Sequence, residues 1–260
     1  MSKINLSTLT KSLTSTQVAL LTIWVLLMIS FPFVDWALGW EAMLVAVSLG
    51  LLAQLIAVIV ILWQAWGITK TLGLGLAIIF FGWAAEVLGS QIGFPFGAYD
   101  YTNTLQPQIL DVPVQVPLGW LMMMPPSWAV AQSLADRVHP RWRFAAFIGL
   151  SALAMTAWDL MMDPMMVSWG MWSWQNPGGY FGIPWSNYVG WLLVAVLITA
   201  IVRPRNLPTA PLLLIYTITW LLEMGGLLLF WDLPGPALVG GLMMGILSVM
   251  GWYAVKTSAE

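Results

Sequence analysis

The stretch from Ala42 to Trp66, AMLVAVSLGLLAQLIAVIVILWQAW, contains no charged residue. An α-helix rises about 1.5 Å per residue, so roughly 20 apolar residues cross the hydrocarbon core of a bilayer. This stretch therefore predicts a transmembrane helix. Similar apolar stretches recur on both sides of it, and together they predict eight spans, at roughly 15–34, 42–66, 72–92, 115–135, 144–162, 186–202, 210–230 and 236–255.

The composition of the whole chain supports the same class. Hydrophobic residues make up 60% of the 260 residues and charged residues 8%, against roughly 45–50% and 25% in soluble domains. Nine basic and 11 acidic side chains are too few to cover a water-exposed surface. We expect an all-α, polytopic membrane bundle that forms one transmembrane domain over residues 1–260. Pro125-Pro126 lies inside the fourth span and is expected to kink it.

The positions of the basic residues predict the orientation of the bundle. With eight spans, every lysine and arginine falls on one side of the membrane, and the links on the other side contain none. Basic links face the cytoplasm, so we expect both termini there, in the cytoplasmic membrane, with the first span as an uncleaved anchor. The nine residues are Lys3, Lys11, Lys70, Arg137, Arg141, Arg143, Arg203, Arg205 and Lys256.

Two absences in the composition exclude several kinds of chemistry. The chain has no cysteine, which excludes disulfides, thiolate catalysis and cysteine-ligated metals. A single histidine, His139, cannot form the multi-histidine iron sites of membrane hydroxylases. A net charge of −2 argues against nucleic acid as a partner. We expect neither a metal nor a cofactor.

Acidic residues inside the spans are the strongest functional signal. Glu86, Asp159 and Glu223 lie in the third, fifth and seventh spans, and Asp163 follows at the end of the fifth, where Pro164 is expected to end the helix. Ionisable groups at membrane depth usually face a partner or a cavity. All three spans run outward, and the first three acids lie at similar depths, roughly 20 Å from the inner surface. We expect them to converge under the outer loops 93–114 and 163–185; the alternative is that each hydrogen-bonds a neighbouring helix separately.

The neighbours of these acids suggest an apolar pocket. Gly82 and Gly89 share a helix face with Glu86 and would leave space around it. Four methionines near Asp159 and Asp163 could line an adaptable groove for a long polyene: Met161, Met162, Met165 and Met166. A carboxylic acid in an apolar pocket can act as a general acid, and aromatic faces attract cations. These features favour protonation of an alkene, followed by addition of water or loss of a proton.

Three irregular motifs point to a known family. They are GFPFGAYDY (93–101), DLMMDP (159–164) and GYFGIP (179–184), the last followed by Asn187 and Gly190-Trp191. Over residues 80–255 the chain resembles the integral-membrane carotenoid biosynthesis proteins of the carotenoid 1,2-hydratase type, whose characterised members hydrate bisanhydrobacterioruberin or γ-carotene.

The resemblance implies a hydro-lyase that needs no cofactor. Such an enzyme adds water to the terminal 1,2 double bond of an acyclic carotenoid end group and gives a tertiary alcohol. The carotenoid would come from the lipid bilayer, among the membrane lipids, and a glycosyltransferase could modify the product later.

We assign hypothetical roles to the candidate residues. Asp159 or Asp163 would protonate the alkene, and Glu86 and Glu223 would bind and activate water. The substrate contacts are expected to come from Trp83, Tyr99, Tyr101, Trp158, Tyr180, Asn187 and Trp220.

Two other functions remain open at this point. A carotene cyclase uses the same protonated alkene and differs in how the cation is quenched. A proton-coupled transporter of a hydrophobic substrate also needs intramembrane carboxyl groups, but it would favour acids near the midplane and broken helices.

Overall fold

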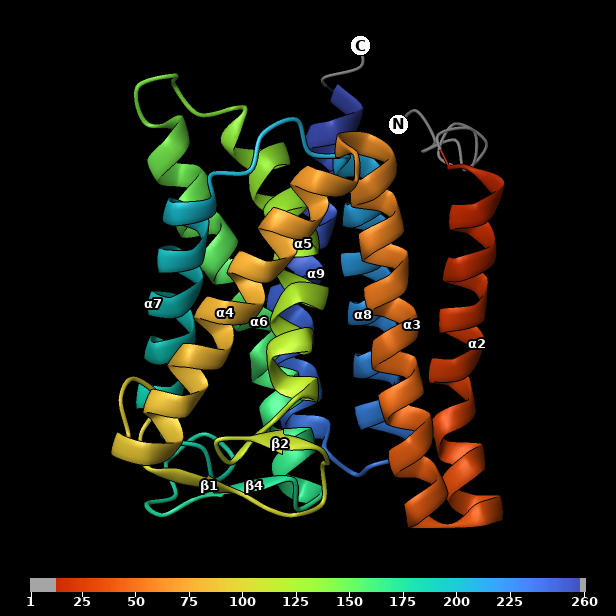
Figure 1. Ribbon diagram of the computed structural model, residues 1–260. Helices are drawn as coiled ribbons and strands as arrows, with labels where there is room; N and C mark the ends of the chain where they lie inside the picture. Colours follow the sequence, from red (N-terminus) through yellow and green to blue (C-terminus); the bar gives the residue numbers. More distant parts are fainter. Residues whose placement is uncertain (1–12, 258–260) are drawn as a thin grey trace.

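A computed structural model describes residues 13–257, which form a bundle of eight helices (Figure 1). The prediction of an all-α polytopic bundle is confirmed; Lys3 and Lys11 lie outside the described residues. Seven of these helices are long and apolar enough to cross a membrane. The helices are α2 (Ser15–Leu38), α3 (Trp40–Trp66), α4 (Ile68–Ile92), α5 (Gln115–Ala135), α6 (Arg143–Ser168), α7 (Trp185–Val202), α8 (Thr209–Leu229) and α9 (Pro234–Thr257).

Helix α5 forms the centre of the bundle. It packs against α3, α4, α6, α8 and α9, and 16 of its 21 residues are buried. Because protein surrounds this helix, it can be less apolar than its neighbours, and it is the helix that falls outside the seven apolar ones. It continues through Pro125-Pro126.

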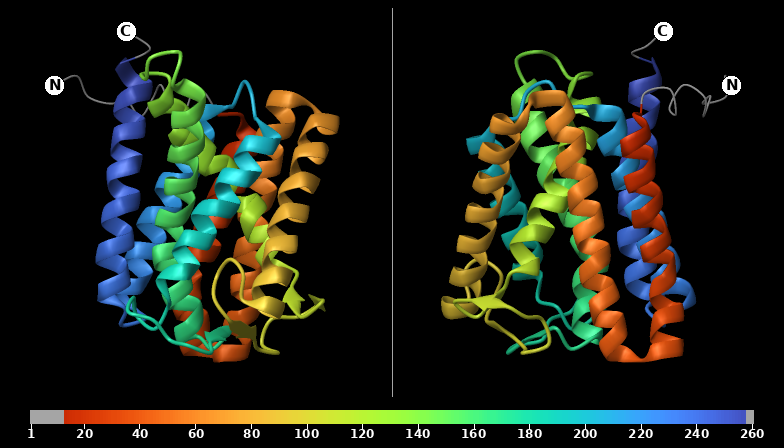
Figure 2. Two further views of the ribbon diagram at one scale, coloured as in Figure 1. Left: turned by 90° about the vertical axis from the view of Figure 1, so that its left-hand side faces the viewer. Right: turned by 45° about the vertical axis from the view of Figure 1, so that its right-hand side comes forward.

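The basic residues gather at one end of the bundle. The α3–α4, α5–α6 and α7–α8 links lie at this end, together with the first turn of α2 and the last turn of α9 (Figures 1 and 2). A hydrogen bond ties the first turn of α4 to the α7–α8 link, because the Lys70 ammonium group donates to the Arg205 carbonyl at 3.1 Å. The described chain therefore has the one-sided charge distribution that the sequence predicted.

The opposite end carries a cap built from two distant loops (Figure 1). Strand β1 (Tyr99–Tyr101) pairs antiparallel with β4 (Trp172–Trp174), while β2 (Gln108–Ile109) pairs with β3 (Val112–Pro113). Successive side chains of a strand point to opposite faces. Tyr99, Trp172 and Trp174 are accordingly buried, whereas Asp100 and Ser173 are exposed. The pairing of β1 with β4 turns an aromatic face toward the helices.

The fifth predicted span ends later than expected. We placed its end near Asp163, but α6 continues through Pro164 to Ser168. Proline has no backbone N–H, so the carbonyl of Leu160, four residues earlier, loses its helical partner. The Tyr180 hydroxyl donates to this carbonyl at 2.9 Å. A side chain from the following loop thus replaces the lost bond and allows the helix to continue.

We predict that Tyr180→Phe lowers the free energy of unfolding by about 1–3 kcal/mol, because the buried Leu160 carbonyl would then have no donor. Thermal unfolding in detergent measures the change. Tyr188→Phe is the matched control, since the Tyr188 hydroxyl is buried without a hydrogen-bond partner in the described part of the chain.

The same substitution in a Pro164→Ala variant tests whether the missing N–H of Pro164 is the cause. In Pro164→Ala the restored amide N–H can bond to the Leu160 carbonyl, so Tyr180→Phe should cost less there. An equal loss in both backgrounds would contradict the explanation.

Candidate functional site

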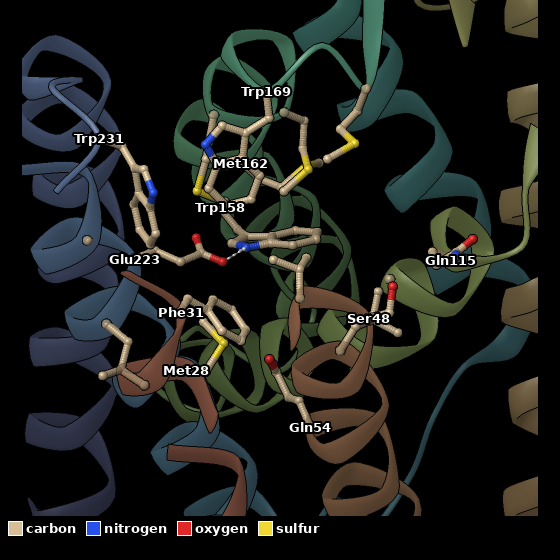
Figure 3. Close-up of a pocket in the computed structure, with 18 of the residues that line it drawn as sticks. Met28, Phe31, Ser48, Gln54, Gln115, Trp158, Met162, Trp169, Glu223 and Trp231 are labelled. Carbon is tan, nitrogen blue, oxygen red and sulfur yellow. Dashed lines mark hydrogen bonds between the residues drawn. The ribbon is translucent and has the colours of Figure 1, made fainter. Parts of the chain in front are cut away.

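An apolar cavity of about 370 Å³ lies beneath the cap, between α2, α3, α5, α6 and α8 (Figure 3). Methionine and aromatic side chains form most of its wall. Ser48, Gln54 and Gln115 add neutral polar groups, and Glu223 is the one carboxyl group among the described residues that line it.

Glu223 of α8 is held at one oxygen and free at the other. The Trp158 indole N–H donates to Glu223 Oε1 at 2.8 Å (Figure 3). Oε2 is buried and has no hydrogen-bond partner in the described part of the chain. A buried carboxyl oxygen without a donor is costly. The free oxygen, in a residue that lines the cavity, is therefore a strong candidate for a reacting group.

Glu86 of α4, by contrast, has donors on both oxygens. The hydroxyl groups of Tyr99 and Tyr101 donate to Glu86 Oε2 at 2.6 and 2.8 Å. The Trp120 indole donates to Oε1 at 3.0 Å. Glu86 does not line the cavity. These contacts suit a carboxyl group that fixes its neighbours in place.

The tyrosines of the cap are suited to remain donors. Burial, followed by the nearby charge of Glu86, raises the pKa of Tyr99 and of Tyr101 well above the usual value of a phenol. Both hydroxyls therefore keep their protons at neutral pH and donate to Glu86. Asp163 also contributes to the raised pKa of Tyr99, which places that ring near a second acid.

Two glycines make room beside Glu86, and the side chains of its donors fill this space in place of the pocket that the sequence suggested. A Cβ atom at Gly82 would lie 2.9 Å from Trp120 Cγ, and one at Gly89 would lie 2.9 Å from the Tyr99 hydroxyl oxygen. Both distances are shorter than ordinary packing contacts. Their positions one turn before and about one turn after Glu86 let both rings lie against the helix.

Asp159 and Asp163 of α6 share one amide. Asn187 of α7 donates from Nδ2 to Asp159 Oδ2 at 3.0 Å and also to Asp163 Oδ2. The Trp172 indole of the cap donates to Asp163 Oδ1 at 3.2 Å. Trp172 lines the cavity, whereas the two aspartates do not. This cluster therefore joins α6, α7 and the cap behind the cavity wall.

A row of three indole rings in contact connects the Glu86 cluster to Glu223. Trp120 stacks on Trp191 with ring centroids 4.3 Å apart and planes 14° apart. Trp191 meets Trp158 edge to face at 5.9 Å. Trp158 and Trp191 both line the cavity, as Glu223 does.

Three of the four acids that the sequence grouped together, Glu86, Asp159 and Asp163, lie close enough to interact electrostatically, whereas Glu223 lies apart from them. The charges of Glu86 and Asp163 both act on the Tyr99 hydroxyl, and Asp159 joins Asp163 through Asn187. Glu223 stands apart in the cavity, and its hydrogen bond goes to Trp158 rather than to another acid. All four are buried, with exposed fractions of 7% or less.

The expected substrate-contact residues also divide into groups. Trp158 lines the cavity. Tyr99, Tyr101, Tyr180 and Asn187 hold the surrounding network through the bonds described above.

The remaining two lie elsewhere. Trp83 donates to the Ile109 carbonyl of the cap at 3.2 Å. Trp220 packs on Gly245 of α9. Neither lines the cavity.

Several cavity residues were absent from our candidate set. Trp172 lies in β4, a short strand within the loop between α6 and α7, and Trp231 lies in the loop after α8. The sequence indicates no facing direction for either. Trp191 was part of the Gly190-Trp191 motif, which was the available signal for it. The methionines were anticipated in part: Met162, Met165 and Met166 line the cavity, whereas Met161 packs on Gly240 of α9.

Comparison with known proteins now identifies the family. Residues 45–247, well over half of the chain, match the family described as "Carotenoid biosynthesis protein". The chain belongs to the carotenoid biosynthesis protein family.

A curated relative of this carotenoid biosynthesis protein is the bisanhydrobacterioruberin hydratase of Haloarcula japonica. The two are 29% identical over 175 residues, which cover 63% of this chain and 58% of the relative. The aligned region thus spans less than two thirds of that relative. No solved structure matches the chain significantly. The family resemblance stated from the motifs is confirmed.

We predict that Gly89→Ala lowers the free energy of unfolding by about 1–3 kcal/mol, the usual cost of overpacking, because the added methyl group would displace Tyr99 and Phe96. Gly73→Ala on the same helix is the control, since a Cβ atom there meets nothing within 4 Å. Thermal unfolding of both variants in detergent measures the difference in stability. Equal stability of the two variants would show that Gly89 does not provide this space.

Proposed function

We propose that this protein adds water to the terminal double bond of an acyclic carotenoid end group, without a cofactor. Family membership and a relative that is named as a hydratase support carotenoid chemistry. The observation that carries the proposal is the half-satisfied carboxyl group of Glu223, in an apolar cavity walled by indole rings.

The reaction begins with proton transfer from Glu223 Oε2. The alkene π electrons form a new C–H bond at the less substituted carbon, and the more substituted carbon becomes a tertiary cation. We expected Asp159 or Asp163 to donate this proton, but neither lines the cavity. Trp158 holds Oε1 and so leaves Oε2 as the donor.

Water completes the addition. Its oxygen forms a bond to the tertiary carbon, and the proton it loses returns to the Glu223 carboxylate. One carboxyl group then serves as acid and as base, and the enzyme ends in its starting state. Gln54 donates from Nε2 to Thr219 at 3.2 Å, which leaves its oxygen as an acceptor to hold the water molecule (Figure 3).

The indole rings would stabilise the cation between these steps. A cation near the face of a tryptophan gains about 0.5–2 kcal/mol, more when water is excluded. Trp158 and Trp191 line the cavity, and the Glu86 network fixes Trp191 through its stack on Trp120. Glu86, Asp159 and Asp163 thus act as positioning residues.

The proposal also includes the setting of the reaction. The basic end of the bundle faces the cytoplasm, both termini lie there, and the cap faces the opposite side of the cytoplasmic membrane. The carotenoid arrives from the bilayer, and a glycosyltransferase can use the tertiary alcohol.

We predict that Glu223→Gln reduces hydration at least about 100-fold, because general acid catalysis contributes roughly 10²–10⁴-fold. The measurement is chromatography and mass analysis of carotenoids from a lycopene-making bacterium that expresses each variant. Glu41→Gln is the control, since Glu41 is an exposed glutamate on α3. Full hydration by Glu223→Gln would refute this role.

The product of the native chain tests the reaction itself. Hydration gives a carotenoid heavier by one water, cyclisation gives an isomer of the substrate, and transport gives no new compound. Either of the last two results would overturn the proposed function.

We predict that Trp158→Phe lowers kcat about tenfold and changes KM little, because an aromatic ring remains but Glu223 loses its orienting N–H donor. The loss should be smaller than the roughly 10²–10⁴-fold that general acid catalysis contributes, because the carboxyl group itself is kept. Steady-state kinetics in reconstituted membranes separate the two constants. Trp63→Phe, at an exposed position of α3, should leave both unchanged. An unchanged kcat in Trp158→Phe would contradict the orienting role.

A further inference from the structure

The cavity reaches the lipid-facing surface at one place. Most of the residues that line it are buried or half-buried. The exposed ones all come from α2, from α8 or from the residue directly after α8: Ile29, Phe33, Leu221, Leu229 and Phe230, with exposed fractions between 48% and 75%. These five side chains belong to both the cavity wall and the outer surface. The cavity therefore opens sideways between α2 and α8, toward the bilayer.

Two phenylalanines stand across this opening. Phe33 of α2 and Phe230 after α8 meet edge to face, with ring centroids 6.3 Å apart. Such a contact contributes about 0.5–1.5 kcal/mol, which thermal motion can break. Pro32 precedes Phe33 within α2 and removes one backbone hydrogen bond of the helix there. The opening is thus closed by a weak contact beside a weakened helix turn.

The cavity is too small for a whole carotenoid. At ~30 Å³ per heavy atom, the volume of a water molecule in the liquid, a cavity of about 370 Å³ holds about a dozen heavy atoms. That matches one end group of two isoprene units. The rest of the polyene must stay outside. The opening between α2 and α8 leads into the bilayer, whose hydrocarbon interior dissolves a polyene.

We propose that the opening between α2 and α8 is a substrate portal, through which one end group enters while the polyene tail remains in the bilayer. The proposal rests on the proposed function for the identity of the chain that enters. It makes the enzyme selective for an end group rather than for a complete carotenoid. Phe33 and Phe230 form the gate of this portal: their contact closes the opening, and their separation opens it.

The chain offers a clean test because it has no cysteine. Phe33→Cys and Phe230→Cys together allow a short bis-methanethiosulfonate reagent to join α2 to α8, and a reductant reverses the link. The control pair is Leu242→Cys with Ile246→Cys, two exposed residues one turn apart on α9. Each single-cysteine variant with the same reagent controls for its bulk.

Two measurements are made in liposomes with lycopene as the probe. Quenching of tryptophan fluorescence reports entry, because Trp158, Trp169, Trp172, Trp191 and Trp231 line the cavity; the control pair gives the background from lipid-facing tryptophans. Product analysis reports hydration. We expect the α2–α8 link to slow both at least about tenfold, as expected when a gate controls access, and reduction to restore both.

The outcomes separate the portal from the chemistry. Unchanged quenching in the linked protein would overturn the portal, whatever the hydration rate. Reversible loss of quenching supports the portal even if the native chain makes no hydrated product, a result that would sink the proposed function alone. If the double variant does not fold, Phe33→Trp takes its place. The larger side chain should slow the entry of lycopene, and an unchanged rate of entry would overturn the proposal.

Discussion

Each carboxyl group inside this bundle must find hydrogen-bond donors without help from a cation or from bulk water. An acid at membrane depth costs at least about 2.5 kcal/mol. The ion pair of Arg143 with Asp136 lies at the basic end of the bundle, away from these acids. Indole, phenol and amide groups therefore take the role of the cation. This requirement determines where the tryptophans, the tyrosines of the cap and the close-packed glycines must lie.

The same requirement divides the acids by their chemistry. A carboxyl group with donors on both oxygens, such as Glu86, is fixed and offers nothing to a substrate. One with a single donor, such as Glu223, has a defined orientation and a free oxygen. The aspartates of α6 differ from each other: Asp163 has a donor on each oxygen, whereas Asp159 Oδ1 has no hydrogen-bond partner within the described residues. Both lie behind the cavity wall. We therefore expect a carboxyl group to react when one of its oxygens lacks a hydrogen-bond donor and its residue lines the cavity.

The sequence predicted the number of helices, of which seven are long and apolar enough to cross a membrane, because lipid-facing helices must be apolar whatever they pack against. It also predicted the space around Glu86, since Gly82 and Gly89 lie on its face of the same helix. It could not predict that α6 passes Pro164, because the compensating hydroxyl of Tyr180 lies in a loop. Nor could it place Glu223 apart from the aspartates, because the rotation of one helix against another depends on packing around α5.

The pairing of β1 with β4 has a consequence for how such chains can diverge over evolution. The cap supplies donors to Glu86 and Asp163, and its two loops are locked in register with each other. A residue inserted in either would shift the alternation and turn Tyr99 or Trp172 away from its acid. The described links at the basic end donate no hydrogen bond to any of the four buried acids. Length variation among descendants should therefore accumulate at that end and be purged from the cap.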